Sequence, residues 1–232
     1  MPEGNFFHYD QAAVDHLARK DKKLAAAMQA IGPVRREVMP DLFQALMHAI
    51  TGQQISMAAQ RTVWGRLCGL LGEVTPQALL AQPQTALQAL GLSARKVDYM
   101  RGIARQVVDG ELDLPGMAAL EDAEVCCRLA ALRGIGVWTA EMLLLFSLQR
   151  SDILSYDDLA IRRGLRMLYR HKEMPRERFE RYRRRFSPYG SLASLYLWAI
   201  AGGALPELDD PAERKKGRSR PAASLKSTVT KD

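Results

Sequence analysis

The apolar residues of this 232-residue chain recur at helical spacing along nearly its whole length. They return three and four residues apart, which places them on one face of an α-helix. We find no sustained alternation of apolar and polar residues, the pattern that is typical of a half-buried strand. The pattern therefore predicts an all-α protein with little or no β-sheet.

Capping and breaking residues set the expected helix boundaries. Serine, threonine and aspartate favour the first position of a helix, whereas glycine and proline favour its end. The segment 10–30 is predicted as one continuous helix. Further helices are expected at residues 42–51, 56–71, 93–110, 159–170, 175–186 and 192–201, with two short helices between 75 and 91 and another beginning at 121.

Two of the expected helices, in residues 122–149, flank the turn Leu132-Arg133-Gly134-Ile135-Gly136 and form a helix-hairpin-helix. Glycines permit backbone angles that other residues avoid and let the backbone approach a ligand. The second helix begins with unpaired N–H groups and a partial positive charge, which suits a DNA phosphate. Asp158 follows Trp138 by twenty residues, so its carboxylate would face the nucleotide that this phosphate holds.

The net charge of +7 is concentrated in two segments. Residues 161–186 hold eleven Lys or Arg against three Glu, and residues 211–232 hold seven against two acids. Such clusters indicate contact with a polyanion, although a solvated helix face explains Arg183-Arg184-Arg185 taken alone. The segment 211–232 has almost nothing to bury, so we expect a folded domain of residues 1–210 and a disordered basic tail.

The cysteines Cys68, Cys126 and Cys127 and the four histidines lack the spacing of a disulfide framework or of zinc or iron–sulfur ligands. We therefore expect no catalytic metal and no organic cofactor. No apolar run reaches membrane-spanning length, and the N-terminus lacks the pattern of a signal peptide. These features predict a soluble, cytoplasmic protein.

Three motifs together resemble the helix-hairpin-helix DNA glycosylase superfamily, and within it the alkylbase branch of the 3-methyladenine DNA glycosylase II type. They are Gly52-Gln53-Gln54-Ile55-Ser56, the segment from Leu132 to Ala140, and Asp157-Asp158-Leu159-Ala160-Ile161, within a matched region of residues 43–203. The resemblance implies two helical subdomains flanking a DNA-binding cleft, in a compact form without the N-terminal mixed-sheet domain. It also implies a monomer that acts on double-stranded DNA containing alkylated bases, in base excision repair.

The reaction that the resemblance implies is hydrolysis of an N-glycosidic bond, and Asp158 is the expected catalytic residue. A carboxylate stabilises positive charge that develops at the anomeric carbon and orients water. A helix N-terminus favours its ionised form. Asp157 is the competing candidate, and Asp158 could instead only cap its helix. The family pattern favours Asp158 and leaves Asp157 as the cap or as a neighbour of DNA.

Trp138 stands where bifunctional members of the superfamily carry a Schiff-base lysine, so the resemblance implies a monofunctional enzyme. A flipped base would stack on Trp138 and on Tyr189, and electron-poor alkylated purines suit aromatic walls. Met142 falls where the family pattern places an aromatic residue. Tyr189 is a second departure, because it replaces a pocket tryptophan of the family pattern. Both departures imply a roomier base pocket. The sequence does not rank 3-methyladenine, 7-methylguanine, hypoxanthine, ethenoadenine and 1-methyladenine as substrates.

The remaining DNA contacts are also implied by the resemblance. The loop Gln53-Gln54-Ile55 would fill the gap left by the flipped base, with Gln54 inserted. The backbone amides of the hairpin would hold a phosphate; these belong to Gly134, Gly136, Val137, Trp138 and Thr139. The carbonyls of Ala130, Leu132 and Ile135 would hold a structural sodium or potassium ion.

Two alternative functions remain open from the sequence. A glycosylase for oxidised or mismatched bases would share the hairpin and the aspartate, but its main versions need the missing lysine or an iron–sulfur cluster. A non-catalytic DNA-binding module would use the hairpin for phosphate contacts alone, and such modules often lack a partnered aspartate.

Overall fold

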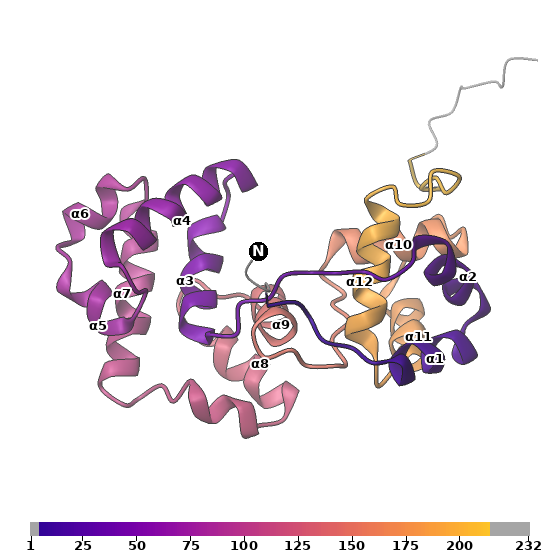
Figure 1. Ribbon diagram of the computed structural model, residues 1–232, viewed down its shortest axis with the longest axis horizontal. Helices are drawn as coiled ribbons and strands as arrows, with labels where there is room; N and C mark the ends of the chain where they lie inside the picture. Colours follow the sequence, from indigo (N-terminus) through magenta and orange to yellow (C-terminus); the bar gives the residue numbers. More distant parts are fainter. Residues whose placement is uncertain (1–4, 214–232) are drawn as a thin grey trace, which may run out of the picture.

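The computed structural model describes residues 5–213, and this part of the chain is almost entirely helical (Figure 1). Extended backbone pairs there at a single isolated antiparallel bridge, between Phe6 and Glu37. The α-helices are α1 (Gln11–Lys20), α2 (Lys22–Ile31), α3 (Leu42–Gly52), α4 (Met57–Leu71), α5 (Pro76–Ala81), α6 (Gln84–Ala89), α7 (Ala94–Val108), α8 (Asp122–Ala130), α9 (Val137–Phe146), α10 (Leu159–Tyr169), α11 (Arg176–Phe186) and α12 (Gly190–Ala201), with a 3₁₀-helix at Pro115–Ala119. The prediction of an all-α fold is confirmed.

The expected helix over residues 10–30 is two helices, so that prediction is wrong in detail. Asp21 adopts an extended conformation between α1 and α2, and its carboxylate accepts the backbone N–H groups of Lys23 and Leu24 at 3.0 Å. An aspartate that caps the next helix competes with continuation of the previous one. The last predicted helix also differs, because α12 begins at Gly190 instead of residue 192.

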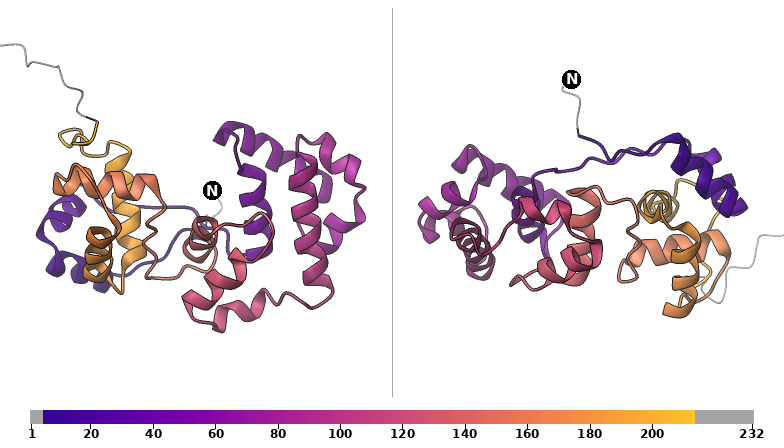
Figure 2. Two further views of the ribbon diagram at one scale, coloured as in Figure 1. Left: turned by 180° about the vertical axis from the view of Figure 1, so that it is seen from behind. Right: turned by 90° about the horizontal axis from the view of Figure 1, so that it is seen from below.

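The helices form two lobes, each around its own hydrophobic core (Figures 1 and 2). One lobe contains α3 to α9, and its core includes Leu46, Met100 and Leu144. The other combines α1 and α2 with α10 to α12, around residues such as Leu24 and Phe179. The second lobe is therefore built from both ends of the described chain.

Two extended segments connect the lobes, on either side of α1 and α2 (Figure 2). They pair through backbone hydrogen bonds from the Phe7 amide to the Arg36 carbonyl (2.8 Å) and from the Val38 amide to the Asn5 carbonyl (2.9 Å). The Met39 amide then donates to the carbonyl of Phe146 at the end of α9 (2.9 Å). These bonds fix the segments against the helix that follows the hairpin turn.

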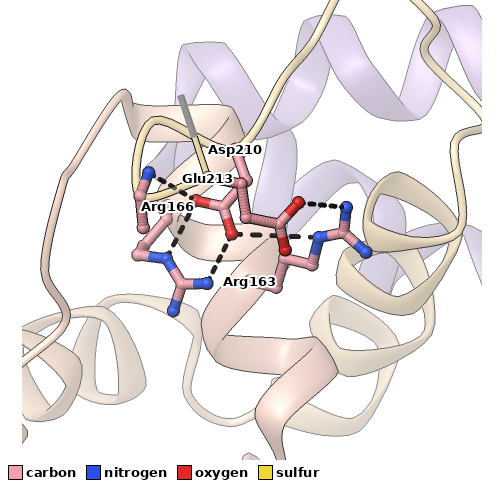
Figure 3. A network of polar contacts seen from close by, with 5 residues as sticks. Arg163, Arg166, Asp210 and Glu213 are labelled. Atoms are coloured by element: carbon pink, nitrogen blue, oxygen red, sulfur yellow. Dashed lines mark hydrogen bonds and ion pairs between the residues drawn. The ribbon is translucent and has the colours of Figure 1, made fainter. Parts of the chain in front are cut away.

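The end of the described chain is attached to α10 by a network of ion pairs (Figure 3). The buried carboxylate of Asp210 accepts hydrogen bonds from Arg166 Nε (3.0 Å) and Nη2 (2.5 Å) and from the Ala212 amide (3.0 Å). Glu213 pairs with Arg163 at 3.1 Å. Residues 211–213 thus pack on the fold, and the rest of the predicted basic tail lies outside the described residues.

No helix in the described part of the chain is long and apolar enough to cross a membrane.

Candidate active site

Two adjoining cavities of about 550 Å³ and 900 Å³ form a cleft: the first is lined by α3, α4 and α9 of one lobe, and the second opens between the two lobes. Both cavities share an apolar and aromatic wall formed by Met39, His48, Trp138, Met142 and Phe146. The first cavity extends towards the loop 52–54, and the second extends towards the extended segment 35–39 and α10. A cleft of this volume, with a shared apolar and aromatic wall and charged groups at one end, is typical of a small-molecule or base-binding site.

Asp158 lies in this cleft at the N-terminus of α10, and only 7% of its surface is exposed. Its Oδ1 atom accepts hydrogen bonds from the Ile161 amide (2.8 Å) and from the indole Nε1 of Trp198 (3.1 Å). Its Oδ2 atom accepts the indole Nε1–H of Trp138 (3.0 Å). The carboxylate therefore caps its helix and also joins α9 to α12, so capping alone does not describe it.

Asp157 does not cap α10, which was one of the two roles expected for it from the sequence. The N-cap of α10 is Asp158, whereas Asp157 is exposed in the preceding loop. An N-cap carboxylate must reach the amide three residues ahead, and only Asp158 is in register with Ile161.

Trp138 and Met142 lie one helical turn apart on α9 and line both cavities. Trp138 is 46% exposed even though its indole N–H is bonded to Asp158, so a face of the ring remains available to a ligand. The structure thus brings the predicted wall residue and the predicted catalytic carboxylate into direct contact.

Tyr189, the other predicted wall of the base pocket, lies elsewhere, so this prediction needs correction. It lines a separate cavity of about 180 Å³ together with Phe7 and Leu192, and its ring packs edge-on against His16 with centroids 5.1 Å apart. Tyr189 precedes α12, and the residue of that helix that reaches the cleft is Trp198, more than two turns further on.

Trp198, Phe146 and His48 are cleft residues that the sequence did not single out. The rings of Phe146 and Trp198 stack with centroids 5.4 Å apart, which connects the two lobes behind Asp158. Both aromatic residues end apolar helical patterns that are equally typical of a core. Only the packing of α12 against α9 shows that they border a cleft.

The loop 53–55 is attached to the hairpin. The side-chain amide of Gln53 donates to the carbonyl of Gly134 at 2.7 Å, and Gln53 and Gln54 line the first cavity. Gln54 is exposed and has a φ of +56°, a left-handed conformation that non-glycine residues seldom adopt. Ile55 is 39% exposed. Of the predicted wedge residues, Gln54 and Ile55 are therefore exposed beside the cleft, whereas Gln53 is half-buried.

The two hairpin glycines have different structural roles. Gly134 has a φ of +90°, and a Cβ atom there would lie 2.2 Å from the ring of Tyr99. Gly136 has a φ of −94°, caps α9, and would place a Cβ atom more than 4 Å from any neighbour. The expectation of unusual backbone angles thus holds for Gly134 and is wrong for Gly136.

Exposed apolar side chains gather in the segments that the sequence assigned to DNA contact. Of the seven large hydrophobic residues that are exposed in the described chain, five lie in or beside the three motifs. They are Ile55, Met57, Val137, Trp138 and Leu159, with exposures of 39% to 74%. Single exposed apolar side chains are common on protein surfaces, so what distinguishes these five is their location in or beside the three motifs.

Glu141 is bonded to the loop that carries Asp158. It lies on α9 three residues after Trp138, and its carboxylate accepts a hydrogen bond from the buried hydroxyl of Ser155, three residues before Asp158. Burial raises the pKa of the Glu141 carboxyl, and the Ser155 hydroxyl opposes that rise. The contact joins the hairpin helix to the loop that carries Asp158.

A family model described as the HhH-GPD superfamily base excision DNA repair protein matches residues 47–188, which contain the hairpin, the loop 53–55 and Asp158. The chain belongs to the HhH-GPD superfamily. DNA-3-methyladenine glycosylase 1 of Schizosaccharomyces pombe is 30% identical over 87% of this chain and 91% of its own length. The resemblance inferred from the three motifs is confirmed.

Two solved structures match most of the chain. A DNA-3-methyladenine glycosidase from Bacillus halodurans is 34% identical with a TM-score of 0.78, covering 88% of this chain and 95% of its own. A 3-methyladenine DNA glycosylase from Schizosaccharomyces pombe in complex with abasic DNA is 30% identical with a TM-score of 0.71, covering 81% and 95%.

Proposed function

We propose that this member of the HhH-GPD superfamily is a monofunctional DNA glycosylase that flips an alkylated base out of double-stranded DNA and hydrolyses its N-glycosidic bond in base excision repair. The observation that carries the proposal is the carboxylate of Asp158, held by two indole N–H groups at the edge of an aromatic cleft. Relatives that cover most of the chain carry the name of this activity.

The catalytic role of Asp158 follows from the charge of the transition state. As the base leaves, positive charge develops at the anomeric carbon of the sugar. A fixed carboxylate stabilises that charge without having to reorganise, and it can orient the attacking water. Three donors determine the position of the Asp158 oxygens, namely the Ile161 amide and the two indoles.

The walls of the cleft favour an alkylated base. Trp138 and Phe146 offer aromatic faces, and Met39 and Met142 offer polarizable sulfur. A methylated purine with a formal positive charge gains cation–π attraction from such rings. We therefore infer 3-methyladenine and 7-methylguanine as the class of substrate.

Monofunctional chemistry is supported by the residues of the cleft, because none of those that line it in the described chain is a lysine. Lys96 lines neither cavity, and its amine instead donates a hydrogen bond to the Thr51 carbonyl at 2.8 Å. We therefore propose base release without cleavage of the backbone.

The proposed DNA contacts lie on the surface beside the cleft. Gln54 is the proposed wedge, with Gln53 and Ile55 beside it, and the amides at the start of α9 are the proposed phosphate contact. We also propose that one protein molecule suffices for the reaction. Since its substrate is genomic DNA, we infer that it acts in the cytoplasm, at the nucleoid in a bacterium.

A monovalent cation is a further part of this proposal. The carbonyls of Ala130, Leu132 and Ile135 lie at the end of α8 and within the hairpin turn. Neutral oxygen donors of this kind suit sodium or potassium. The Leu132 carbonyl accepts the Ile135 amide at 3.0 Å and keeps a second lone pair. If a cation joins these carbonyls to a phosphate, DNA affinity should fall when tetramethylammonium replaces potassium at equal ionic strength. Equal affinity in both salts would contradict the ion.

Replacement of Asp158 tests the proposal directly. Base release from methylated double-stranded DNA should fall by a factor of about a thousand in Asp158→Asn, the range found when a key charge-stabilising group is removed. Asp157→Asn is the matched control and should retain most of the activity. Strand nicking, scored before and after alkali, should appear only after alkali.

Other results would favour the rival functions. Activity of the wild type on oxidised or mismatched DNA but not on methylated DNA would favour a glycosylase for oxidised or mismatched bases. DNA binding without release of any base would favour the non-catalytic module.

A further inference from the structure

His48 occupies a central position in the cleft. It lies on α3 and belongs to the wall that the two cavities share. It is also the sole ionisable side chain that lines the first cavity among the described residues. A base that enters beside Trp138 therefore comes close to this imidazole.

The imidazole is held in place by α4. Its ring packs edge-on against Trp64 with centroids 5.0 Å apart. Gln60 Nε2 lies 3.2 Å from His48 Nε2 and 3.0 Å from the His48 carbonyl oxygen. These contacts fix the ring in the wall of the first cavity, which Gln60 also lines.

Several charged groups surround the cleft, and the charge of the His48 ring adds to the field that they produce there. The extended segment contributes Arg35, Arg36 and Glu37, and α10 contributes Asp158. On α7, which packs on α3, Lys96 donates to the Thr51 carbonyl one turn from His48. Histidine is the side chain among these whose charge ordinarily changes between pH 5 and 8.

Burial lowers the pKa of the His48 imidazole below its usual value. The neutral form therefore predominates at pH 7, and the ring becomes charged only in more acidic solution. A neutral ring in the wall leaves the aromatic faces free to attract a cation, whereas a charged ring at the same place repels one.

We propose that the charge of His48 determines which bases the cleft accepts: the neutral imidazole admits a base with a positive charge, and the protonated imidazole rejects it. This specificity role rests on the proposed glycosylase function and extends it to the selection of cationic alkylpurines. His48 acts on the bound base through its charge and takes no part in bond cleavage.

The test compares the wild type with His48→Gln and His48→Lys on DNA that contains 7-methylguanine, a positively charged base, between pH 5 and 8. The wild-type rate of base release is divided by the His48→Gln rate at each pH, which removes pH effects common to both proteins. This ratio should fall about tenfold towards the acidic end of the range, because burial lowers the pKa of the His48 imidazole below its usual value. His48→Lys should release the base about tenfold more slowly than His48→Gln at every pH.

DNA with a tetrahydrofuran abasic analogue provides the control, because it carries no base charge. All three proteins should bind it with equal affinity, and their circular dichroism spectra should agree. A rate ratio that does not change with pH would overturn the inference, as would equal rates for His48→Lys and His48→Gln. The inference would also be overturned if His48→Lys lost affinity for abasic DNA by the same factor as its rate of base release. The charge would then act on DNA binding and not on the selection of the base.

These outcomes are distinct from failure of the proposed function. If the wild type binds abasic DNA but releases no methylated base at any pH, the glycosylase proposal fails, and this inference fails with it. If the wild type releases the base and the ratio stays flat, only the role of His48 is overturned.

Discussion

At the scale of single residues, the site depends on one carboxylate and the donors that hold it. The two indole donors to Asp158 come from helices far apart in the chain, α9 and α12. Hydrogen bonds to an ionised group are stronger than those between neutral groups. Trp138 and Trp198 should therefore influence the rate of base release as well as the shape of the cleft.

Trp198→Phe removes one indole donor but keeps an aromatic ring to stack on Phe146. We expect kcat to fall roughly tenfold, since a hydrogen bond to a charged group contributes about 1.5–3 kcal/mol. KM and the affinity for abasic DNA should change little, because phenylalanine keeps an aromatic ring at this position of the cleft wall. Single-turnover rates and binding isotherms measure the two effects separately. A large rise in KM with unchanged kcat would contradict the positioning role of Trp198.

At the scale of elements, the helix-hairpin-helix combines a structural requirement with a functional one. Gly134 has a left-handed backbone conformation and lies against Tyr99, whereas Gly136 caps α9 with open space beside it. The first position is thus constrained by the fold. The second leaves room for a ligand to approach the amides of the first turn.

Alanine at each glycine should separate these two requirements. Gly134→Ala should lower the free energy of unfolding by about 1–3 kcal/mol, because it adds a strained φ and a clash with Tyr99. Gly136→Ala should leave stability nearly unchanged and weaken DNA binding, since its methyl group would stand where a phosphate approaches. Urea denaturation and DNA titration measure the two effects. Equal loss of stability in both variants would contradict this assignment.

At the scale of the whole molecule, the second lobe unites both ends of the described chain. Asp21 contributes to this by capping α2 and by pairing with Arg185 of α11 at 2.7 Å, across 164 residues of sequence. Burial opposes ionisation of this carboxyl, but the Leu24 amide and Arg185 outweigh it and hold its pKa below the usual value.

Asp21→Ala should therefore lower the free energy of unfolding at pH 7 by about 2–4 kcal/mol, through loss of the cap and of the ion pair. Because the folded-state pKa is depressed, the contribution is present above the unfolded pKa of about 3.9 and is lost as the pH falls through the lower folded value. The stability difference between wild type and Asp21→Ala should shrink below about pH 4, which urea denaturation at several pH values measures. Asp15→Ala, at an exposed position of α1, is the control. A difference that stays constant down to pH 2 would contradict the linkage.

The sequence by itself determined the helical class, most helix boundaries and the hairpin. These depend on local causes: apolar spacing, capping residues and glycine at a left-handed position. The break at Asp21 was also encoded locally, since aspartate is a strong N-cap, but the apolar pattern on both sides of it concealed the break.

Only the tertiary structure decided which residues share the cleft. Tyr189 immediately precedes α12 and Trp198 lies within it, yet the packing of this helix turns Trp198 towards Asp158 and leaves Tyr189 beside His16. His48 and Phe146 likewise occupy apolar helical positions that the sequence cannot distinguish from core. The physical reason is that spacing along one helix defines a face, whereas the partner of that face depends on contacts with other helices that the spacing does not encode.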